Sequence, residues 1–223
     1  MRKQNSTPFS VAEYDEQIKK TLPFYEEMYQ QIIDIVKLLN RQSLHWLDVG
    51  CGTGKMARTA MKHFDIQKIV CIDIEQDMLE KAKLFCNDEK VEFQQCDIRE
   101  FVNESKFDIV TAIQVHHYLK GQERVNAVKN CFDVLKDTGI YISFENFAPD
   151  SEDGKRMYLE RWKQYQIANG KNKEEAELHI GRYGKEYFPI TIAEQIKLLK
   201  DCGFQTVEVL WVSYMQAGIL ARK

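Results

Sequence analysis

Three glycines at alternate positions, Gly50, Gly52 and Gly54, follow a short apolar run over residues 44–49 that carries one acid, Asp48. After the glycines, residues 55–64 place apolar side chains at helical spacing. A strand that turns through glycines into a helix presents bare backbone N–H groups and a helix N-terminus to a ligand. The sequence therefore predicts a nucleotide or cofactor site at this loop.

The spacing of the glycines and the acid before them narrow the choice of ligand. A phosphate-binding P-loop has a glycine where Val49 stands and a hydroxyl residue where Met56 stands. A dinucleotide fingerprint has its third glycine one residue later than Gly54, and Asp48 would face the negatively charged pyrophosphate. The loop thus favours a ligand with a positive or zwitterionic part and no phosphates.

Acidic residues also follow the next two apolar runs. Asp73 ends the second run, 19 residues after Gly54, and a carboxylate there could accept both hydroxyls of a ribose. A helix N-cap is the alternative role, although Asp77 stands closer to the expected helix start. Asp97 follows the third run and could accept a hydrogen bond from an adenine amino group or cap a helix. The residues expected beside the nucleoside are Ile74, Met78 and Ile98.

Two adjacent histidines, His116 and His117, follow the fourth apolar run. An unperturbed imidazole titrates near pH 6.5, so either could act as a general base, with His117 the stronger candidate. The alternatives are a histidine that caps a helix or packs against neighbouring segments, and one that contacts the substrate without taking a proton.

The elements that must position these residues alternate along the chain. We predict strands over 44–49, 68–73, 90–94, 107–114 and 139–145, with helices over 54–64, 75–87, 98–104 and 121–136 between them. This alternation predicts a doubly wound α/β fold with a mostly parallel sheet, whose ligands bind at the carboxyl ends of the strands. A helix over 191–201 and strands over 205–212 and 214–221 would complete seven strands, ending in an antiparallel hairpin strand.

Two helical segments lie outside the alternation. Residues 10–40 form an amphipathic, tyrosine-rich segment broken at Pro23, and residues 150–183 read as two helices hinged near Gly170. We expect a single domain over 1–223, with N-terminal lid helices over 10–40, a core over 44–146 and 190–223, and a helical cap over 150–187. An aromatic face at helical spacing is also typical of a core. The cap residues that could line an acceptor pocket are Tyr158, Arg161, Trp162, Tyr165, Arg182, Tyr183 and Tyr187.

Over residues 44–146, the glycine loop, the two acids and the fourth-strand segment occur in an order that resembles the Rossmann-like S-adenosylmethionine (SAM) methyltransferases. The resemblance implies SAM as cofactor and S-adenosylhomocysteine as product. It also implies that Asp48, the loop over 50–54 with Cys51, and Gln114 hold the amino-acid part of SAM. Tyr14, in Glu13-Tyr14-Asp15, resembles the lid tyrosine that packs over SAM in small-molecule methyltransferases.

The C-terminal part is also similar to a narrower group. The run over 201–204, followed by Trp211 and preceded by Arg182, resembles carboxy-SAM synthases, which use an arginine to hold the extra carboxylate of a modified SAM. Methyl transfer to a small molecule is thus the main hypothesis. A carboxy-SAM synthase or other non-methylating SAM user, and a SAM-binding regulator without turnover, remain as alternatives.

Composition limits the possible partners. The net charge is −3, the isoelectric point is near 6.0, and Lys and Arg are spread along 223 residues, which argues against a nucleic-acid surface. Six cysteines form no C-x-x-C pair and have no zinc-type histidine spacing, so we expect no metal ion. The N-terminus is polar and no run approaches the roughly 18 apolar residues of a membrane span. We therefore expect a cytoplasmic protein with a small-molecule substrate, no membrane partner and an oligomeric state that the sequence leaves open.

Overall fold

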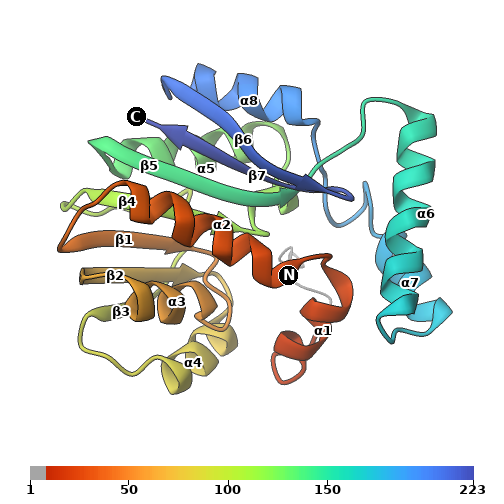
Figure 1. Ribbon diagram of the computed structural model, residues 1–223, viewed down its shortest axis with the longest axis horizontal. Helices are drawn as coiled ribbons and strands as arrows, with labels where there is room; N and C mark the ends of the chain where they lie inside the picture. The colour runs from red at the N-terminus through yellow and green to blue at the C-terminus, as the bar shows by residue number, and fades with distance from the viewer. Residues whose placement is uncertain (1–8) are drawn as a thin grey trace.

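A seven-stranded sheet forms the centre of the computed structural model, which describes residues 9–223 (Figure 1). The strand order is β3-β2-β1-β4-β5-β7-β6, and every neighbouring pair is parallel except the two pairs that involve β7. The strands are β1 (Leu44–Val49), β2 (Ile66–Asp73), β3 (Val91–Gln95), β4 (Phe107–Ile113), β5 (Leu135–Asn146), β6 (Thr206–Ser213) and β7 (Gln216–Arg222).

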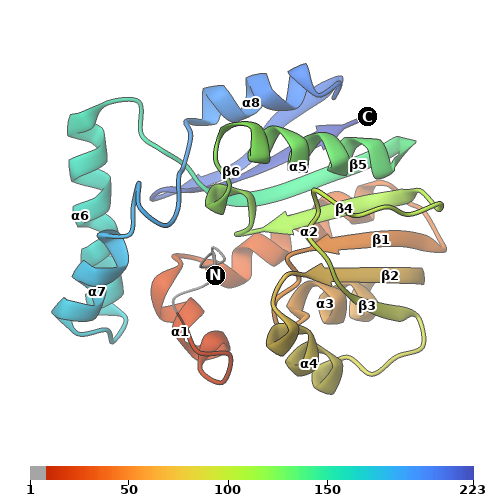
Figure 2. The same ribbon diagram turned by 180° about the vertical axis from the view of Figure 1, so that it is seen from behind.

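The central strands are apolar on both sides because helices cover both faces of the sheet. Successive residues of β1 illustrate this: Trp46 belongs to the core under one set of helices and Leu47 to the core under the other. Helices α2 (Tyr25–Leu38) and α3 (Lys55–His63) pack on the first face, and α5 (Gly121–Val134) and α8 (Ile192–Asp201) on the second (Figures 1 and 2). Helix α4 (Gln76–Phe85) lies near the β3 edge. The doubly wound, mostly parallel fold predicted from the sequence is confirmed.

Three further helices stand to one side of the sheet. Helix α1 (Tyr14–Thr21) precedes Pro23, while α6 (Glu152–Ala168) and α7 (Lys173–Ile180) form an antiparallel pair that Figures 1 and 2 show apart from the sheet, beside α1. The indole N–H of Trp162 donates to the Thr21 carbonyl over 2.7 Å, which joins α6 to the end of α1. In the range 9–223, no helix has both the length and the apolar character needed to cross a membrane.

One predicted helix and one predicted strand start were wrong. The helix expected over 98–104 is instead a turn and loop between β3 and β4. Asn130 of α5 donates its side-chain amide to the carbonyls of Ile98 and Phe101. The segment therefore packs on α5 as a turn, without the i→i+4 backbone hydrogen bonds of an α-helix. Strand β5 begins at Leu135, four residues before the predicted start at 139, and pairs there with Phe107.

Candidate functional site

A cavity of about 280 Å³ lies where β1, β2 and β4 end. Val49, Ile72 and Ile113, at or next to the ends of these strands, contribute to its wall. Helix α1 closes another side with Tyr14 and Ile18, and the segment after α6 contributes residues to the far end. The cavity therefore extends from the sheet to the cap, which is the arrangement expected for an open α/β sheet.

The glycine loop forms the near wall of this cavity. Gly50, Gly52 and Gly54 have φ values of +61°, +52° and +76°, a region that side-chain-bearing residues rarely adopt. A Cβ atom on Gly50 would lie 2.5 Å from a methyl carbon of Val115. At Gly52 the nearest atom would be 3.9 Å away, on the Tyr14 ring, so this side of the loop faces open space. The loop thus presents bare backbone to the cavity, as its spacing predicts.

Asp73 lies in the cavity wall, next to Ile74 and Met78. Its Oδ2 accepts from the Gly52 N–H at 2.8 Å and its Oδ1 from the Glu75 N–H at 3.0 Å. Burial raises the pKa of this carboxyl above its ordinary value, although the backbone N–H groups act in the opposite direction. Asp73 is therefore held rigidly, with its orientation set by two loops.

Asp97 and Ile98 also line the cavity, but Asp97 has a partner that the sequence did not reveal. Arg99 donates from Nε at 3.0 Å to both carboxylate oxygens, and from Nη2 at 2.5 Å to Oδ2. Burial alone would raise the pKa of Asp97, but the hydrogen bonds of Arg99 lower it below its usual range. Any ligand amino group that reaches Asp97 must share it with Arg99.

Asp48 lies in a side chamber of about 20 Å³ beside the glycine loop. Thr111 donates to its Oδ1 at 2.8 Å, while Oδ2 is buried and has no hydrogen-bond partner. Burial raises the pKa of Asp48 to about 7. A buried oxygen without a partner is costly unless a donor satisfies it. The other residues of the chamber are Tyr14, Tyr25, Tyr29, Gly50, Cys51, Gly52, Thr53, Lys55, Met56, Ile113 and Gln114.

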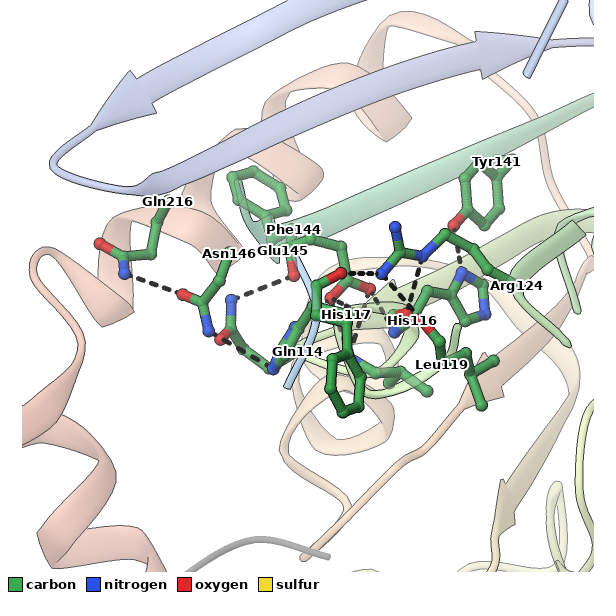
Figure 3. Close-up of polar contacts among 12 residues, drawn as sticks. Gln114, His116, His117, Leu119, Arg124, Tyr141, Phe144, Glu145, Asn146 and Gln216 are labelled. Atoms are coloured by element: carbon green, nitrogen blue, oxygen red, sulfur yellow. Dashed lines mark hydrogen bonds and ion pairs between the residues drawn. The ribbon is translucent and has the colours of Figure 1, made fainter. Parts of the chain in front are cut away.

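Gln114 joins the side chamber to the main cavity and lines both. Its φ is +60°, an uncommon conformation for a residue with a side chain. The Gln114 backbone N–H donates to the Phe144 carbonyl at 2.7 Å, and its side-chain amide donates to the same oxygen at 3.2 Å (Figure 3). These two hydrogen bonds to β5 hold the strained backbone of Gln114 in place, directly after the end of β4.

The two histidines, which share the short 3₁₀ turn over His116–Tyr118, have different surroundings (Figure 3). His117 lines the cavity, and its Nδ1 lies 2.5 Å from Oε2 of Glu145. His116 is absent from the lining: its Nδ1 meets the Tyr141 hydroxyl at 3.0 Å, and its Nε2 is buried without a partner. Of the two predicted base candidates, only His117 faces the cavity.

Glu145 is a residue of this site that was not predicted from the sequence. Besides His117, it accepts backbone N–H groups from Val115 at 3.1 Å and from His116 at 2.8 Å. Burial alone would raise the pKa of Glu145, but the hydrogen bond and charge of His117 lower it below its ordinary value. The side chain is 3% exposed. An acid at the end of the strand predicted over 139–145 is the signal of this role in the sequence.

Asn146 determines which nitrogen of His117 carries a proton. Its Oδ1 accepts from the Gln216 side-chain amide at 2.9 Å, which turns its own NH₂ group toward His117 Nε2 at 3.4 Å. Nε2 must therefore accept, and the ring proton of a neutral His117 sits on Nδ1 and is donated to Glu145. In this tautomer Nε2 carries a lone pair, which a general base needs in order to accept a proton.

Of the seven cap residues predicted to line an acceptor pocket, Arg182 and Tyr187 line the cavity. Arg161 lies over the Tyr214 ring at 3.9 Å, which Tyr165 also contacts, and Tyr158 is partly exposed. Trp162 is buried behind the wall and Tyr183 packs edge-on against its neighbour Tyr187. His179 of the cap lines the cavity without having been predicted as a site residue.

Comparisons with known proteins agree with this geometry. A family model described as a methyltransferase domain matches residues 47–139. Carboxy-SAM synthase of Nautilia profundicola is 24% identical over 200 residues, covering 89% of this chain and 85% of that protein. Carboxy-SAM synthase of Helicobacter hepaticus is 25% identical over 219 residues, covering 94% and 90%.

Two solved structures have the same fold at low identity. A plantazolicin methyltransferase, BpumL, in complex with a desmethyl analogue and S-adenosylhomocysteine, aligns with a TM-score of 0.71 at 14% identity over 94% of this chain and 89% of that one. Magnesium protoporphyrin IX methyltransferase of Synechocystis, with bound SAM, aligns with a TM-score of 0.63 at 15% identity over 99% and 88%. Residues 47–139 of this chain thus match a methyltransferase domain, and the whole chain has the fold of SAM-dependent methyltransferases.

The residues of this site fit SAM as the cofactor. SAM carries a positive ammonium and sulfonium, and the orphaned Oδ2 of Asp48 is a buried acceptor suited to an ammonium donor. Asp73 offers a rigid carboxylate at the cavity wall for the ribose hydroxyls. Bare backbone at Gly52 leaves room beside Tyr14. The assignment of individual residues to parts of SAM stays a prediction.

Proposed function

We propose that this methyltransferase transfers a methyl group to a small-molecule acceptor whose nucleophile lies beside His117. The observation that carries the proposal is the buried His117–Glu145 pair: His117 lines the cavity, and its Nε2 lies 3.4 Å from the amide nitrogen of Asn146, another lining residue. SAM supplies an electrophilic methyl group when bound. A pre-oriented imidazole at the same cavity is useful only if the acceptor must lose a proton, so we infer an acceptor with an O–H or N–H group.

His117 serves this reaction as a general base. Its Nε2 takes the acceptor proton, and the Glu145 carboxylate, 2.5 Å from Nδ1, stabilises the imidazolium that forms. Three backbone N–H groups hold Glu145 from the opposite side, at 2.8–3.3 Å, so the pair does not reorient when the charge moves. A positioned base contributes about 10²–10⁴ in rate.

Helix α1 and the cap are proposed to exclude water from this reaction. Asp15 of α1 accepts from Thr53 of the glycine loop at 2.7 Å, and the carbonyl of Thr21 accepts from Trp162 of the cap at 2.7 Å. Both contacts tie α1 across the cavity through few hydrogen bonds, as a lid that opens for exchange of ligands requires. Alignment in a dry cleft supplies much of the barrier reduction in a displacement.

A carboxy-SAM synthase activity is the second candidate, favoured by Arg182. Its guanidinium lines the cavity, its side chain is 6% exposed, and its Nε donates to Glu186 at 2.8 Å. The similarity to carboxy-SAM synthases extends over most of the chain. In that reaction, Arg182 would face a carboxylate on the cofactor itself.

A screen of small-molecule acceptors, read by release of S-adenosylhomocysteine, tests the main proposal. Release with an O–H or N–H acceptor, lost in His117→Gln and kept in His116→Gln, is the expected result. Mass spectrometry of the cofactor that copurifies with the protein separates the second candidate, because a carboxylated SAM would be found. Binding of SAM without consumption across a broad screen would identify a regulator and would overturn both enzymatic proposals.

A further inference from the structure

Two buried cations lie in the cap end of the molecule. Arg182 lines the cavity, and Lys171, 6% exposed, lies behind it with its Nζ 3.1 Å from the Gln166 amide oxygen and 4.8 Å from the centre of the Phe9 ring. Glu186, which pairs with Arg182, has an exposed side chain, and Glu174 and Glu175, which follow Lys171, are exposed as well. Burial lowers the pKa of Lys171 to about 8, as expected for an ammonium held by a neutral amide and a ring.

Polar atoms without partners lie at the same end. Within the described residues, the Tyr187 hydroxyl and Nδ1 of His179 are buried and have no hydrogen-bond partner, and both residues line the cavity. The side-chain nitrogen of Gln166, beside Lys171, is buried and unpaired as well. Buried polar atoms are normally satisfied, so a cluster of them at a cavity wall indicates a ligand that supplies the missing partner.

A continuous aromatic wall joins this cluster to the proposed base. The Tyr187 ring lies edge-on to His117, with 5.9 Å between centroids, and 6.4 Å from Trp162. Trp162 in turn contacts His179 at 5.1 Å. The Tyr118 ring lies tilted against His117, with 4.3 Å between centroids, and Tyr118 hydrogen-bonds with Arg182. A flat apolar body placed along this wall would reach from His117 Nε2 to the cluster.

We propose that the cap end is an oxyanion subsite, and that the methyl acceptor carries a carboxylate there. Tyr187, His179 and Arg182 donate to the carboxylate, Lys171 adds positive potential from behind, and the body of the acceptor lies along the aromatic wall. This inference rests on the proposed methyl transfer, since it places the carboxylate at one end of the acceptor and the nucleophile at the other. Charge-assisted hydrogen bonds in a desolvated pocket make such recognition strong and specific.

Direct binding tests the subsite without turnover. Calorimetry on protein saturated with S-adenosylhomocysteine would compare carboxylates with their neutral amides: acetate with acetamide, benzoate with benzamide, and phenylacetate with phenylacetamide. We expect at least one acid to bind about tenfold or more tightly than its amide, since hydrogen bonds to a charged group carry that discrimination. Tyr187→Phe and Lys171→Met should each weaken the acid about three- to tenfold and leave its amide unchanged. Lys173→Met removes an exposed cation of the same cap and should change neither.

The unmodified protein provides a second measurement, should a cap variant fold poorly. In NMR spectra, the preferred acid should shift the imidazole resonances of His179, whereas those of exposed His63 should stay constant. Equal affinity of every acid and its amide, or equal losses in Lys173→Met and Lys171→Met, would overturn the subsite.

Binding measured with and without the cofactor product distinguishes a carboxylate on the acceptor from a carboxylate on the cofactor. Binding of the acid together with S-adenosylhomocysteine assigns the carboxylate to the acceptor. Binding only in its absence, with a carboxylated SAM in the purified protein, assigns the carboxylate to the cofactor and overturns the acceptor assignment. If acids are preferred but none of their hydroxylated relatives releases S-adenosylhomocysteine, the proposed methyl transfer fails while the oxyanion subsite stands.

Discussion

The two ends of the cavity carry opposite charge. At the cofactor end, the acids Asp48, Asp73 and Asp97 surround a loop of bare backbone. At the cap end, Arg182 and Lys171 lie among aromatic rings. A cationic cofactor and an anionic acceptor would each find the complementary end, and His117 lies between the two. The difference indicates that the cleft orients two ligands electrostatically before any covalent step.

The two ends also differ in how their residues are held. Each acid of the cofactor end stands at the end of a strand or directly after it, so the backbone of one element positions it. Residues of the cap end come from α7 and the loops on either side of it and are positioned by contacts with α1, α6 and the turn at His117. Perturbing one end should therefore leave the other largely intact, and the variants below test this separation.

The largest expected effect follows from His117→Gln. This change keeps an amide near the Glu145 carboxylate but removes the base, so turnover should fall by about 10²–10⁴. Because His117 belongs to the acceptor side, the affinity for SAM should stay within about twofold of the wild-type value, as measured by calorimetry.

His116→Gln is the matched control. It removes the contact between His116 and the Tyr141 hydroxyl, so the melting temperature should fall while turnover persists. Loss of turnover in His116→Gln with normal turnover in His117→Gln would show that the two roles are exchanged. No effect of either change would mean that the acceptor needs no base.

Asp48 makes stability depend on pH in the ligand-free protein. Its pKa is raised from 3.8 to about 7 in the folded state, so the folded protein binds this proton more tightly than the unfolded chain. The resulting stabilisation is present below pH 3.8 and is lost as the pH rises through 7. Asp48→Asn removes this dependence and should be more stable than the wild type at pH 8, by up to about 4 kcal/mol.

Urea unfolding at pH 5 and pH 8, with each protein free of cofactor, measures this effect. The same variant should bind SAM more weakly, because an amide no longer attracts an ammonium. Identical slopes of unfolding free energy against pH in the variant and the wild type would remove Asp48 as the titrating group.

Asp73→Ala should weaken SAM binding by about 2–4 kcal/mol, the scale of two hydrogen bonds to a charged group. Asp73→Asn keeps the shape and should fall between Ala and the wild type. Affinity for the preferred carboxylate at the cap end should change by less than about twofold, which sharpens the separation of the two ends. An unchanged SAM affinity in Asp73→Ala would exclude this residue from the ribose site.

The smallest effect is expected at the lid. Asp15 joins α1 to Thr53 at 2.7 Å and to Lys81 at 3.1 Å, in a position that water reaches. Such pairs contribute up to about 1 kcal/mol, so Asp15→Ala should speed amide exchange of α1 by about fivefold or less without ligand. Glu16→Ala, which removes only an exposed pair with Lys20, is the control.

In the wild type, adding S-adenosylhomocysteine should slow exchange over α1, because a lid orders over its ligand. Equal exchange with and without ligand would make α1 a permanent part of the core. It would also contradict the proposal that α1 moves as a lid while the sheet stays fixed.

The sequence by itself determined the fold and the cofactor end. Alternating strands and helices, the glycine spacing after β1 and the acids after β2 and β3 are local patterns, and each is read within about 30 residues of its neighbour. Parallel strands bring their carboxyl ends to one edge, so the joint position of these residues follows from the fold class. The missed helix over 98–104 shows the limit of local reading, since Asn130, about 30 residues away, takes its carbonyls.

Tertiary structure decided the rest of the site. His116 and His117 are adjacent in sequence and chemically identical, and only Glu145 and Tyr141 of β5 send them to opposite sides. Helical spacing in α6 predicted several cap residues, yet that helix turns most of them to the outside or into its own packing. Of the predicted cap residues, only Arg182 and Tyr187, both beyond α7, reach the cavity. Periodicity reveals which face of a helix is apolar. The direction in which that face points depends on contacts such as that of Trp162 with Thr21 at the end of α1, more than a hundred residues away in sequence.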